Sequence, residues 1–502
     1  MQSIVQRVGF FAGPIIALCV YFALPDQYVD THKALITLTF SAKTTVCMTI
    51  WMAIWWLSEA IDISATALLP IVMFPLLDIA DIKTTTAPYA SHLIFLFMGG
   101  FLIALAMQRW KLDHRLANNV LAIVGSNPIM IVAGFMFASA VLSAFISNTA
   151  TTAVMLPIGL SIIALYTSKE HGSFDNPDQH NFARCMMLGI AYASSIGGTM
   201  TLIGTAPNLF LASFLQDGIN EQYIIEISFV KWLSFAAPLA LFFLPITWYV
   251  LTKRIFPFDI SLLKQATRSP EQTKEKMTRG QKITIIVFSI TVLLWITRPL
   301  LQKLSINFNG QVLQPLYQLS DPGIAMLAAM LLFVIPVDFK KRLFVLDWET
   351  AKKLPWGIFI LFGGGLTLAK AIKTNGVAEF IAAQALLLPD MPEFIYVLII
   401  CAGVIFLTEL TSNTATTATL VPILSGIAIG VGIHPYLLIF PATLAASFAF
   451  MMPIATPPNA IVFGSGHITI AEMCKAGFWL NILGVITISA FTFFVIKPIL
   501  DI

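Results

Sequence analysis

The triplet Ser-Asn-Thr occurs twice in this chain, and both copies interrupt a long apolar stretch. The six residues are Ser147, Asn148, Thr149, Ser412, Asn413 and Thr414. Their side chains supply neutral oxygens that suit a hard cation, and hydroxyl and amide donors that suit an anion. Two matching interrupted segments, one in each half of a chain, indicate the binding site of a secondary transporter.

Each triplet lies near the centre of an apolar stretch, 128–166 or 394–433, which is too long for one span. Arms of about 17 residues reach roughly 25 Å as helices, so each stretch predicts a helical hairpin with the triplet at its tip. At such a tip the first arm ends in free carbonyls, which favour a cation. The second arm begins with free amides, which favour an anion, and Thr149 is expected to cap it.

A hydroxyl precedes each triplet by one helical turn, at Ser143 and at Thr408. Its recurrence in both copies favours a sodium ligand. The alternative is a hydroxyl that bonds back to a carbonyl of its own helix.

Two further breaks, GTAPN at 204–208 and ATPPN at 455–459, interrupt later apolar stretches. Because proline disrupts the helical ladder, carbonyls at Gly204 and Ala455 are predicted to complete the ion sites. Thr205 and Thr456 are predicted to offer hydroxyls to the substrate. The alternative is an ordinary proline kink, which helices in lipid tolerate.

Neither triplet region contains Lys, Arg or His. A dianion would therefore be held by helix amino ends, hydroxyls and bound cations, and sodium would supply the missing positive charge. Glu409 is the nearest charge and could serve an ion or proton step, or be structurally paired. Glu59 lies near a predicted membrane boundary and is expected to be interfacial.

The composition indicates an integral, multi-pass membrane protein. Of 502 residues, 58% are hydrophobic and 11% are charged, against about 25% charged in soluble domains. No basic patch suggests nucleic acid, and the five scattered cysteines suggest neither zinc nor disulfides. The connections 252–282 and 338–354 are basic and are predicted to be cytoplasmic, whereas 300–320 is predicted to be outside. A bacterial cell inner membrane is the expected location.

Three landmarks recur in the same order, which indicates an internal duplication. FLFMGGFL at 95–102 matches FILFGGGL at 359–366, the triplets match each other, and GTAPN matches ATPPN. The prediction is an all-α inverted-repeat transporter. Its parts are a first repeat 1–251 with a broken helix 186–215, a basic linker 252–282, and a second repeat 283–502 with a broken helix 436–465.

These residues resemble the divalent anion/sodium symporter family, in which paired Ser-Asn-Thr triplets occupy two hairpin tips. The segment FAFMMPIATPPNAIVFGSGH at 448–467 is close to the family's C-terminal signature. The resemblance implies a homodimer with a scaffold domain and a transport domain that moves like an elevator. It also implies two sodium sites and a substrate site. The first sodium site is Ser143, Ser147, Asn148 and Gly204, and the second is Thr408, Thr411, Asn413 and Ala455. The substrate site is Ser147, Asn148, Thr149, Thr205, Ser412, Asn413, Thr414, Thr456 and Pro457.

The chain is therefore predicted to be a sodium-coupled importer of C4 dicarboxylates such as succinate, malate or fumarate, with Na⁺ as coupling ion and lipid as its surroundings. A sodium-independent dicarboxylate exchanger on the same fold and an anion channel are the alternatives. An enzyme is not expected, because no nucleophile–base pair or metal-ligand cluster occurs in the apolar stretches.

Overall fold

A computed structural model describes residues 4–31, 33–115, 127–166, 177–259, 276–308 and 311–502. Helices dominate these residues, and six short strands form only three two-stranded antiparallel pairs. Seven of the described helices are long and apolar enough to cross a membrane. The prediction of an all-α, multi-pass protein is confirmed. The middle of the predicted linker, 260–275, lies outside the described residues.

The first half of the chain contains both unbroken helices and the first interrupted pair. Its helices are α1 Ile4–Ala23, α2 Phe40–Ser58, α3 Ile63–Thr66, α4 Leu69–Leu76, α5 Ile82–Thr86, η1 Ala87–Ala90, α6 His92–Arg109, α8 Pro128–Ser143, α9 Asn148–Tyr166, α10 Pro177–Gly198, α11 Ala206–Asp217, η2 Glu221–Tyr223, α12 Phe229–Tyr249 and η3 Val250–Ile255. The strands β1 Gln27–Val29 and β2 Leu35–Thr37 pair between α1 and α2.

The second half contains the second interrupted pair of helices. Its helices are α13 Arg279–Leu301, α14 Asp321–Val334, α15 Trp348–Ala351, α16 Trp356–Thr374, α17 Val377–Ala385, α18 Glu393–Thr408, α19 Asn413–Gly430, α20 Tyr436–Ala445, α21 Pro457–Phe463, α22 Ile470–Phe491, η5 Thr492–Ile496 and α23 Lys497–Leu500. The strands β3 Ile306–Phe308 and β4 Gln311–Leu313 form one pair, and β5 Pro336–Asp338 and β6 Leu343–Phe344 form another.

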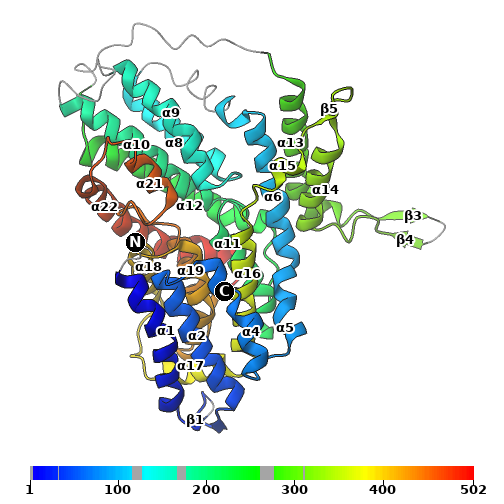
Figure 1. Ribbon diagram of the computed structural model, residues 1–502, viewed down its shortest axis with the longest axis vertical. Coiled ribbons are helices and arrows are strands. Elements are labelled where there is room, and N and C mark those ends of the chain that lie inside the picture. Colours follow the sequence, from blue (N-terminus) through cyan, green and yellow to red (C-terminus); the bar gives the residue numbers. More distant parts are fainter. Residues whose placement is uncertain (1–3, 32, 116–126, 167–176, 260–275, 309–310) are drawn as a thin grey trace.

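The two hairpins lie in different parts of the molecule. Figure 1 shows α8, α9 and α10 together at one end, α1, α2 and α17 at the other, and α18 and α19 between them. The segments that carry the two triplets are joined indirectly, because α10 packs against α8 and α21 while α11 packs against α19.

The recurring glycines of the first landmark allow close helix packing. A Cβ atom on Gly99 of α6 would lie 2.7 Å from the backbone of Ala325 in α14. In the second copy, a Cβ on Gly364 of α16 would lie 2.3 Å from the carbonyl oxygen of Ala67. Both positions therefore need glycine, because a side chain there would push the helices apart.

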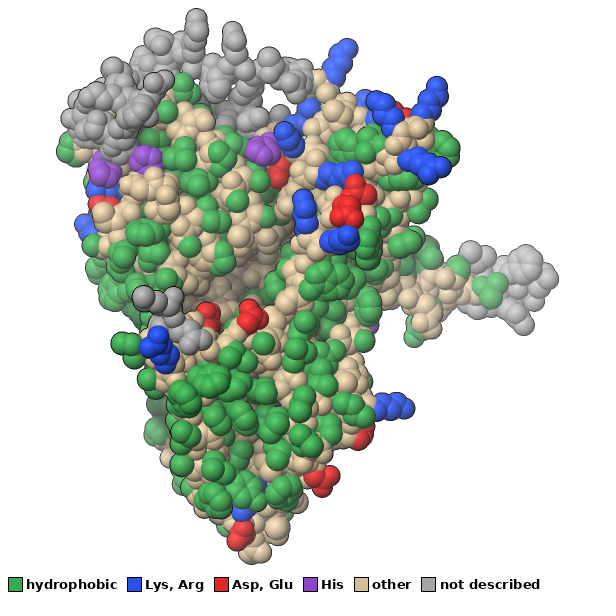
Figure 2. All heavy atoms as spheres, in the orientation of Figure 1, with side chains coloured by type: hydrophobic (Ala, Val, Ile, Leu, Met, Phe, Trp, Pro, Cys, Tyr) green, Lys and Arg blue, Asp and Glu red, His purple; other side chains and the backbone are tan. Residues whose placement is uncertain are grey.

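The outer surface is apolar over large areas. Figure 2 shows hydrophobic side chains over much of the end that contains α1 and α2, whereas lysine and arginine gather at the opposite end. On α1, for example, Phe22 is 77% exposed, and on α13 Leu293 is 58% exposed. An exposed apolar belt of this extent is typical of a protein surrounded by lipid.

Two local features lie outside the predictions from the sequence. The apolar run 63–80 contains two helices, α3 and α4, and Pro70 occupies the first turn of α4, where its missing N–H costs nothing. The short helix α17 was not predicted, because it follows α16 after only two residues, Asn375 and Gly376, and shares its apolar character.

Candidate functional site

Both triplets stand where one helix ends and another begins. In the first hairpin α8 ends at Ser143 and α9 begins at Asn148. The Ser147 hydroxyl accepts a hydrogen bond from the Ala150 N–H at 3.3 Å, so Ser147 caps α9 and the prediction that Thr149 would do so is wrong. Thr149 is exposed instead, one residue into the helix. In the second hairpin α18 ends at Thr408, and Ser412 is the residue before the first residue of α19.

Each asparagine of a triplet accepts a hydrogen bond from the hydroxyl that precedes its tip. Ser143 Oγ donates to Asn148 Oδ1 at 2.6 Å, and Thr408 Oγ1 donates to Asn413 Oδ1 at 2.7 Å. Both hydroxyl residues are fully buried. The hydroxyls therefore bond across the tip rather than back to their own helices, and in both copies they bring two side-chain oxygens together.

The backbone around the first break lies close to the first of these pairs. A Cβ on Gly198 would lie 2.2 Å from Asn148 Oδ1, so the end of α10 passes directly beside this side chain. A Cβ on Gly204 would lie 2.4 Å from the Gly198 oxygen and 3.1 Å from the Ala144 oxygen. Gly204 was predicted to lie here, whereas Gly198 and Ala144 were not. Several neutral oxygens within this small volume match the ligand preference of a hard monovalent cation.

The second pair has a similar neighbour. Thr408 Oγ1 also lies within hydrogen-bond distance, 3.0 Å, of the carbonyl oxygen of Ala446 at the end of α20, so its single proton is shared between this oxygen and Asn413. The predicted ligand Thr411 is engaged elsewhere, since its hydroxyl donates to the Leu407 oxygen at 3.0 Å and contacts Thr416 Oγ1 at 2.7 Å. Ala455, the other predicted member, is buried beside the cavity described below. The structure thus brings Thr408 and Asn413 together and leaves Thr411 at one side.

Buried asparagines stabilise the two breaks that follow the hairpins. Between α10 and α11, Asn208 Nδ2 donates to the carbonyl oxygens of Gly198, Thr199 and Thr201, with the shortest bond 2.7 Å long. Between α20 and α21, Asn459 Nδ2 donates to the Ala449 and Met452 oxygens at 3.2 and 3.0 Å.

Asn208 and Asn459 are the last residues of GTAPN and ATPPN, and they bond to carbonyls at matching positions of the two copies. The breaks are therefore stabilised by specific side-chain hydrogen bonds, so they are more than simple proline kinks. The sequence alone did not assign the two asparagines this role.

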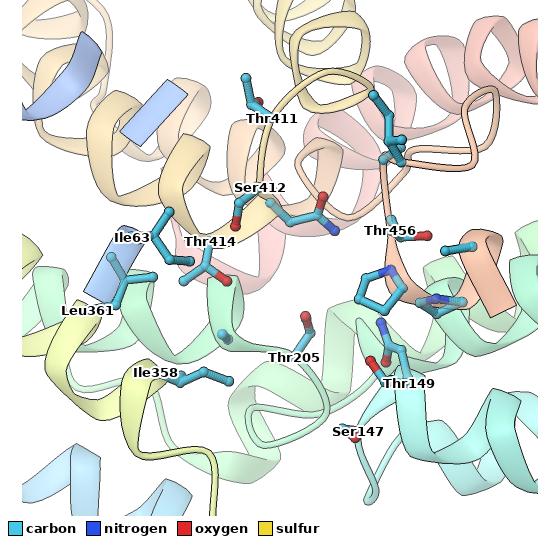
Figure 3. Close-up of a pocket in the computed structure, with 18 of the residues that line it drawn as sticks. Ile63, Ser147, Thr149, Thr205, Ile358, Leu361, Thr411, Ser412, Thr414 and Thr456 are labelled. Carbon is cyan, nitrogen blue, oxygen red and sulfur yellow. The ribbon is translucent and has the colours of Figure 1, made fainter. Parts of the chain in front are cut away.

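The predicted substrate residues surround one cavity of about 650 Å³. All nine of them line it, together with Gly204, Thr411 and Ala455 of the predicted ion residues, whereas Ser143 and Thr408 lie behind its wall. Figure 3 shows Ser147, Thr149, Thr205, Ser412, Thr414 and Thr456 around this space, contributed by four different segments.

Four helices begin at the cavity, namely α9, α11, α19 and α21. The amino ends of α9, α11 and α19 carry free N–H groups and a partial positive charge, so they attract an anion, whereas α21 begins with Pro457 and Pro458, which have no N–H. Of the described residues that line the cavity, Glu59 is the one with a charged side chain, and none is Lys, Arg or His. The electrostatic attraction for an anion therefore comes from the backbone.

One part of the cavity wall is apolar. It contains Ile63 from α3, Phe97 and Phe101 from α6, and Ile358 and Leu361 from α16. Figure 3 shows Ile63, Ile358 and Leu361 on one side of the space. Phe97, Phe101 and Leu361 belong to the duplicated FLFMGGFL and FILFGGGL segments, whose place at the cavity was not predicted. Glu59, predicted to be interfacial, also reaches this cavity.

Glu409 is buried and hydrogen-bonded, which agrees with the structural alternative for this residue. Its carboxylate accepts bonds from the backbone N–H groups of Phe450, Met451 and Met452 and from Asn481 Nδ2. The carboxylate thus ties the tip of the second hairpin to the break between α20 and α21.

Solved structures share this fold. MtrF of Neisseria gonorrhoeae, described as illuminating a class of antimetabolite efflux pumps, aligns with a TM-score of 0.60 at 15% identity, over 98% of this chain and 95% of its own. The YdaH transporter of Alcanivorax borkumensis aligns with a TM-score of 0.62 at 12% identity, over 98% of both chains. At such low identity these likenesses concern the fold alone.

Other proteins are more similar to this chain in sequence than these two structures are. The sodium-dependent dicarboxylate transporter SdcS of Staphylococcus saprophyticus is 39% identical over 99% of this chain and 92% of its own length. The protein of the same name from Staphylococcus aureus strain USA300 is 38% identical over the same shares. The family profile described as the sodium:sulfate symporter transmembrane region matches residues 15–499. The resemblance to the divalent anion/sodium symporters is therefore confirmed, and the chain belongs to this family of membrane transporters.

Proposed function

We propose that the chain is a sodium-coupled symporter that imports C4 dicarboxylates such as succinate, malate or fumarate. The observation that carries the proposal is the cavity, at which four helices begin and whose described lining contains no basic side chain. A dianion placed there meets backbone N–H groups and hydroxyls, and cotransported sodium supplies the remaining positive charge. The relatives at 38–39% identity carry the name of sodium-dependent dicarboxylate transporters, which supports this substrate and this ion.

The roles of individual residues follow from their places. The substrate carboxylates bind at the two triplets, with Thr205, Thr456 and Pro457 beside them. One sodium ion binds at the Ser143–Asn148 pair with oxygens of the first break, and another at the Thr408–Asn413 pair with the Ala446 oxygen. Because the substrate and each ion meet the same asparagine from different sides, binding of one organises the site for the other.

We also propose that transport proceeds by an elevator movement in a homodimer. In this proposal the hairpins and broken helices form the moving domain, and α6 and α16 belong to the scaffold. The placement of the cavity between polar helix ends and an apolar wall supports this division, because the polar groups can keep their substrate while they slide past side chains that make no hydrogen bonds. Family membership supports the homodimer.

The decisive experiment is uptake of radiolabelled succinate into proteoliposomes with an inward sodium gradient or with potassium in its place. We expect saturable uptake that needs sodium and that excess malate and fumarate inhibit. Inhibition by citrate, sulfate and 2-oxoglutarate, tested in parallel, defines how strictly the site selects a C4 dianion. Sodium-independent counterflow would instead assign an exchanger, and uptake that does not saturate would assign a channel.

A further inference from the structure

A basic turn follows directly after a helix whose exposed side is apolar. On α14, Leu327 and Val334 are largely exposed, as expected for a helix that faces lipid. The strands β5 and β6 come next, and the turn that joins them, 339–342, has the sequence Phe-Lys-Lys-Arg. All four turn residues are exposed. Figure 1 shows β5 near α13 and α15, at the end of the molecule where Figure 2 shows lysine and arginine side chains.

The base of this hairpin is fixed to the rest of the protein. The Leu346 N–H donates to the Leu332 carbonyl oxygen at 2.9 Å, and Trp110 Nε1 donates to the Val345 carbonyl oxygen at 2.8 Å. Val345 and Leu346 are both buried. The hairpin is thus held against α14 and the end of α6, so its turn keeps a defined position.

The turn keeps most of its positive charge uncompensated. Asp338 Oδ1 accepts hydrogen bonds from the backbone N–H groups of Lys340 and Lys341 at 3.0 and 3.2 Å. The Lys341 ammonium lies 4.0 Å from Asp338, which makes a weak, exposed pair. Of the ion pairs formed among the described residues, none includes Lys340 or Arg342. An anion that approaches the turn therefore meets cations that are free to bind it.

Arg342 has a backbone conformation that favours glycine or asparagine. Its φ is 49°, in the left-handed region, where a β-carbon is unfavourable. The geometry of the turn therefore does not explain why this residue is an arginine, and its side chain calls for another explanation. A guanidinium is well suited to a phosphate group, because its N–H donors match phosphate oxygens in pairs.

The length of the hairpin places this charge near the level of lipid headgroups. Val334 is the last residue of α14 and is 62% exposed, so the apolar surface extends to the end of the helix. The residues 335–338 separate the helix from the turn and reach at most about 13 Å, since a strand advances about 3.3 Å per residue. The headgroup region of one leaflet is roughly 5–8 Å thick. Long cationic side chains on the turn can therefore reach the lipid phosphates.

Exposed aromatic side chains accompany the cations. Phe339 is 80% exposed at the turn, and Trp348 is 63% exposed at the start of α15, where its ring lies 6.2 Å from that of Phe333. Aromatic side chains at the end of a lipid-facing helix are typical of the membrane interface. An acidic protein segment would explain the cations, but it would not explain their continuity with a surface that faces lipid.

We propose that the turn 339–342 binds an anionic phospholipid of the cytoplasmic leaflet, where the connection 338–354 is predicted to lie. Arg342 and the two lysines contact the headgroup phosphate, and the Phe339 ring contacts the beginning of the acyl chains. The inference rests on membership of a family of membrane transporters and not on the proposed substrate or coupling ion. Because the base of the hairpin is fixed, a bound lipid would hold α6 and α14 at a constant depth in the bilayer.

The test is photo-crosslinking from the turn itself. A photoreactive benzoylphenylalanine in place of Phe339 keeps an aromatic ring at this position. The purified protein is reconstituted in phosphatidylcholine vesicles that contain a minor share of phosphatidylglycerol, irradiated, and analysed by mass spectrometry. We expect phosphatidylglycerol among the lipid adducts at about fivefold or more above its share of the bilayer, because each nearby cation contributes about that factor to binding an anionic surface. High salt should reduce the enrichment.

The variant with Lys340→Gln, Lys341→Gln and Arg342→Gln in the same background should return the adducts to the composition of the bilayer. Adducts that already match the bilayer when the three cations are present would overturn the proposal. Lys340→Arg together with Lys341→Arg keeps the charge and should keep the enrichment, which separates the effect of charge from a local change of structure. Loss of enrichment in this conservative variant would also contradict the proposal.

The matched control removes the same amount of charge from exposed lysines of other connections, namely Lys33, Lys83 and Lys303, by changing each to glutamine. It should keep the enrichment, because the proposal concerns the turn and not the net charge of the protein. An equal loss of enrichment in this control and in the variant of the turn would overturn the proposal. A probe that crosslinks to a protein in whole cells and to no lipid would do the same, since it would assign the turn to a protein partner.

Discussion

Asn148 and Asn413 each have two tasks, because each is the first residue of a helix that begins at the cavity and each accepts the hydroxyl bond that crosses its hairpin tip. Alanine at either position removes the asparagine oxygen from the candidate sodium site, and it also removes a polar group from the cavity wall. The loss is not compensated, since the described lining contains no basic side chain that could take over.

Asn148→Ala and Asn413→Ala should therefore each abolish sodium-driven succinate uptake while the protein is still expressed and inserted. Uptake into proteoliposomes at equal protein content measures this effect. Asn220→Ala, a change of the same type in the short connection before η2, is the matched control and should keep wild-type uptake. Activity close to that of the wild type in both triplet variants would show that transport does not need the hairpin tips.

Ser143→Ala should raise the sodium concentration for half-maximal uptake by about five- to tenfold, as expected for the loss of a hydrogen bond worth about 1 kcal/mol. The succinate KM at saturating sodium should change little, because Ser143 lies behind the cavity wall. Ser161→Ala on α9 is the control, since its hydroxyl is exposed and bonds only to the Pro157 carbonyl. A sodium curve that is the same in Ser143→Ala and Ser161→Ala would contradict the ion assignment.

At the scale of elements, the two broken helices depend on one amide group each. Asn208 and Asn459 are fully buried, and their Nδ2 groups hold the carbonyls that would otherwise point into an apolar interior. Gly198, whose oxygen accepts a bond from Asn208, lies directly beside Asn148, so Asn208 connects the stability of the first break with the first candidate ion site.

Asn208→Ala should lower the free energy of unfolding by about 1–3 kcal/mol for each carbonyl left without a donor, and it should abolish uptake. Thermal unfolding in detergent measures the first effect and proteoliposome uptake the second. Asn459→Ala, which frees two carbonyls rather than three, should be the milder of the two. A variant with normal stability and transport would show that water replaces the amide without loss.

Close packing between α8 and α10 gives a second prediction at this scale. A Cβ on Gly197 would lie 2.3 Å from the Ala140 oxygen, so Gly197→Ala should separate these helices, lower the melting temperature and slow transport. Gly403→Ala on α18 is the matched control, because a Cβ there meets nothing within 4 Å and alanine favours a helix by up to about 1 kcal/mol. A fall in melting temperature for Gly403→Ala equal to that for Gly197→Ala would contradict the packing argument.

The sequence predicted the elements better than their interactions. The triplets located both hairpin tips, because a polar interruption of an apolar stretch is a local feature. The partners of Glu409 and of the asparagines in the breaks lie 7–72 residues away in sequence, so local patterns could not identify them. The apolar wall was also missed, because phenylalanine and leucine in a membrane helix look the same whether they face lipid, another helix or a cavity.

At the scale of the whole molecule, one buried cluster joins three helices from the two halves of the chain. Arg298 near the end of α13 lies 3.3 Å from Asp321 of α14 and 2.9 Å from Glu226. Asp321 in turn accepts a hydrogen bond from the Phe229 N–H at the start of α12. The Arg298 and Asp321 side chains are 9% and 5% exposed, so neither charge has water to replace its partner.

Arg298→Ala should therefore destabilise the protein by about 3–5 kcal/mol, the usual effect of leaving one member of a buried ion pair alone. The melting temperature of the purified protein in detergent provides the measurement. Lys341→Ala is the control, because Lys341 is 79% exposed and lies 4.0 Å from Asp338, so its loss should have almost no effect. Similar melting temperatures for the two variants would mean that the cluster does not stabilise the contact between α12, α13 and α14.

The apolar wall formed by Phe97, Phe101, Ile358 and Leu361 has a mechanical consequence. Side chains of this kind form no directional bonds, so in the proposed elevator movement no bond to them has to break when the opposite surface shifts past them. They also repel bare ions, which keeps the contact watertight during the shift. In this proposal the wall both permits sliding and excludes ions. A polar residue in place of one of its members would form hydrogen bonds that slow the movement, and it would let ions pass.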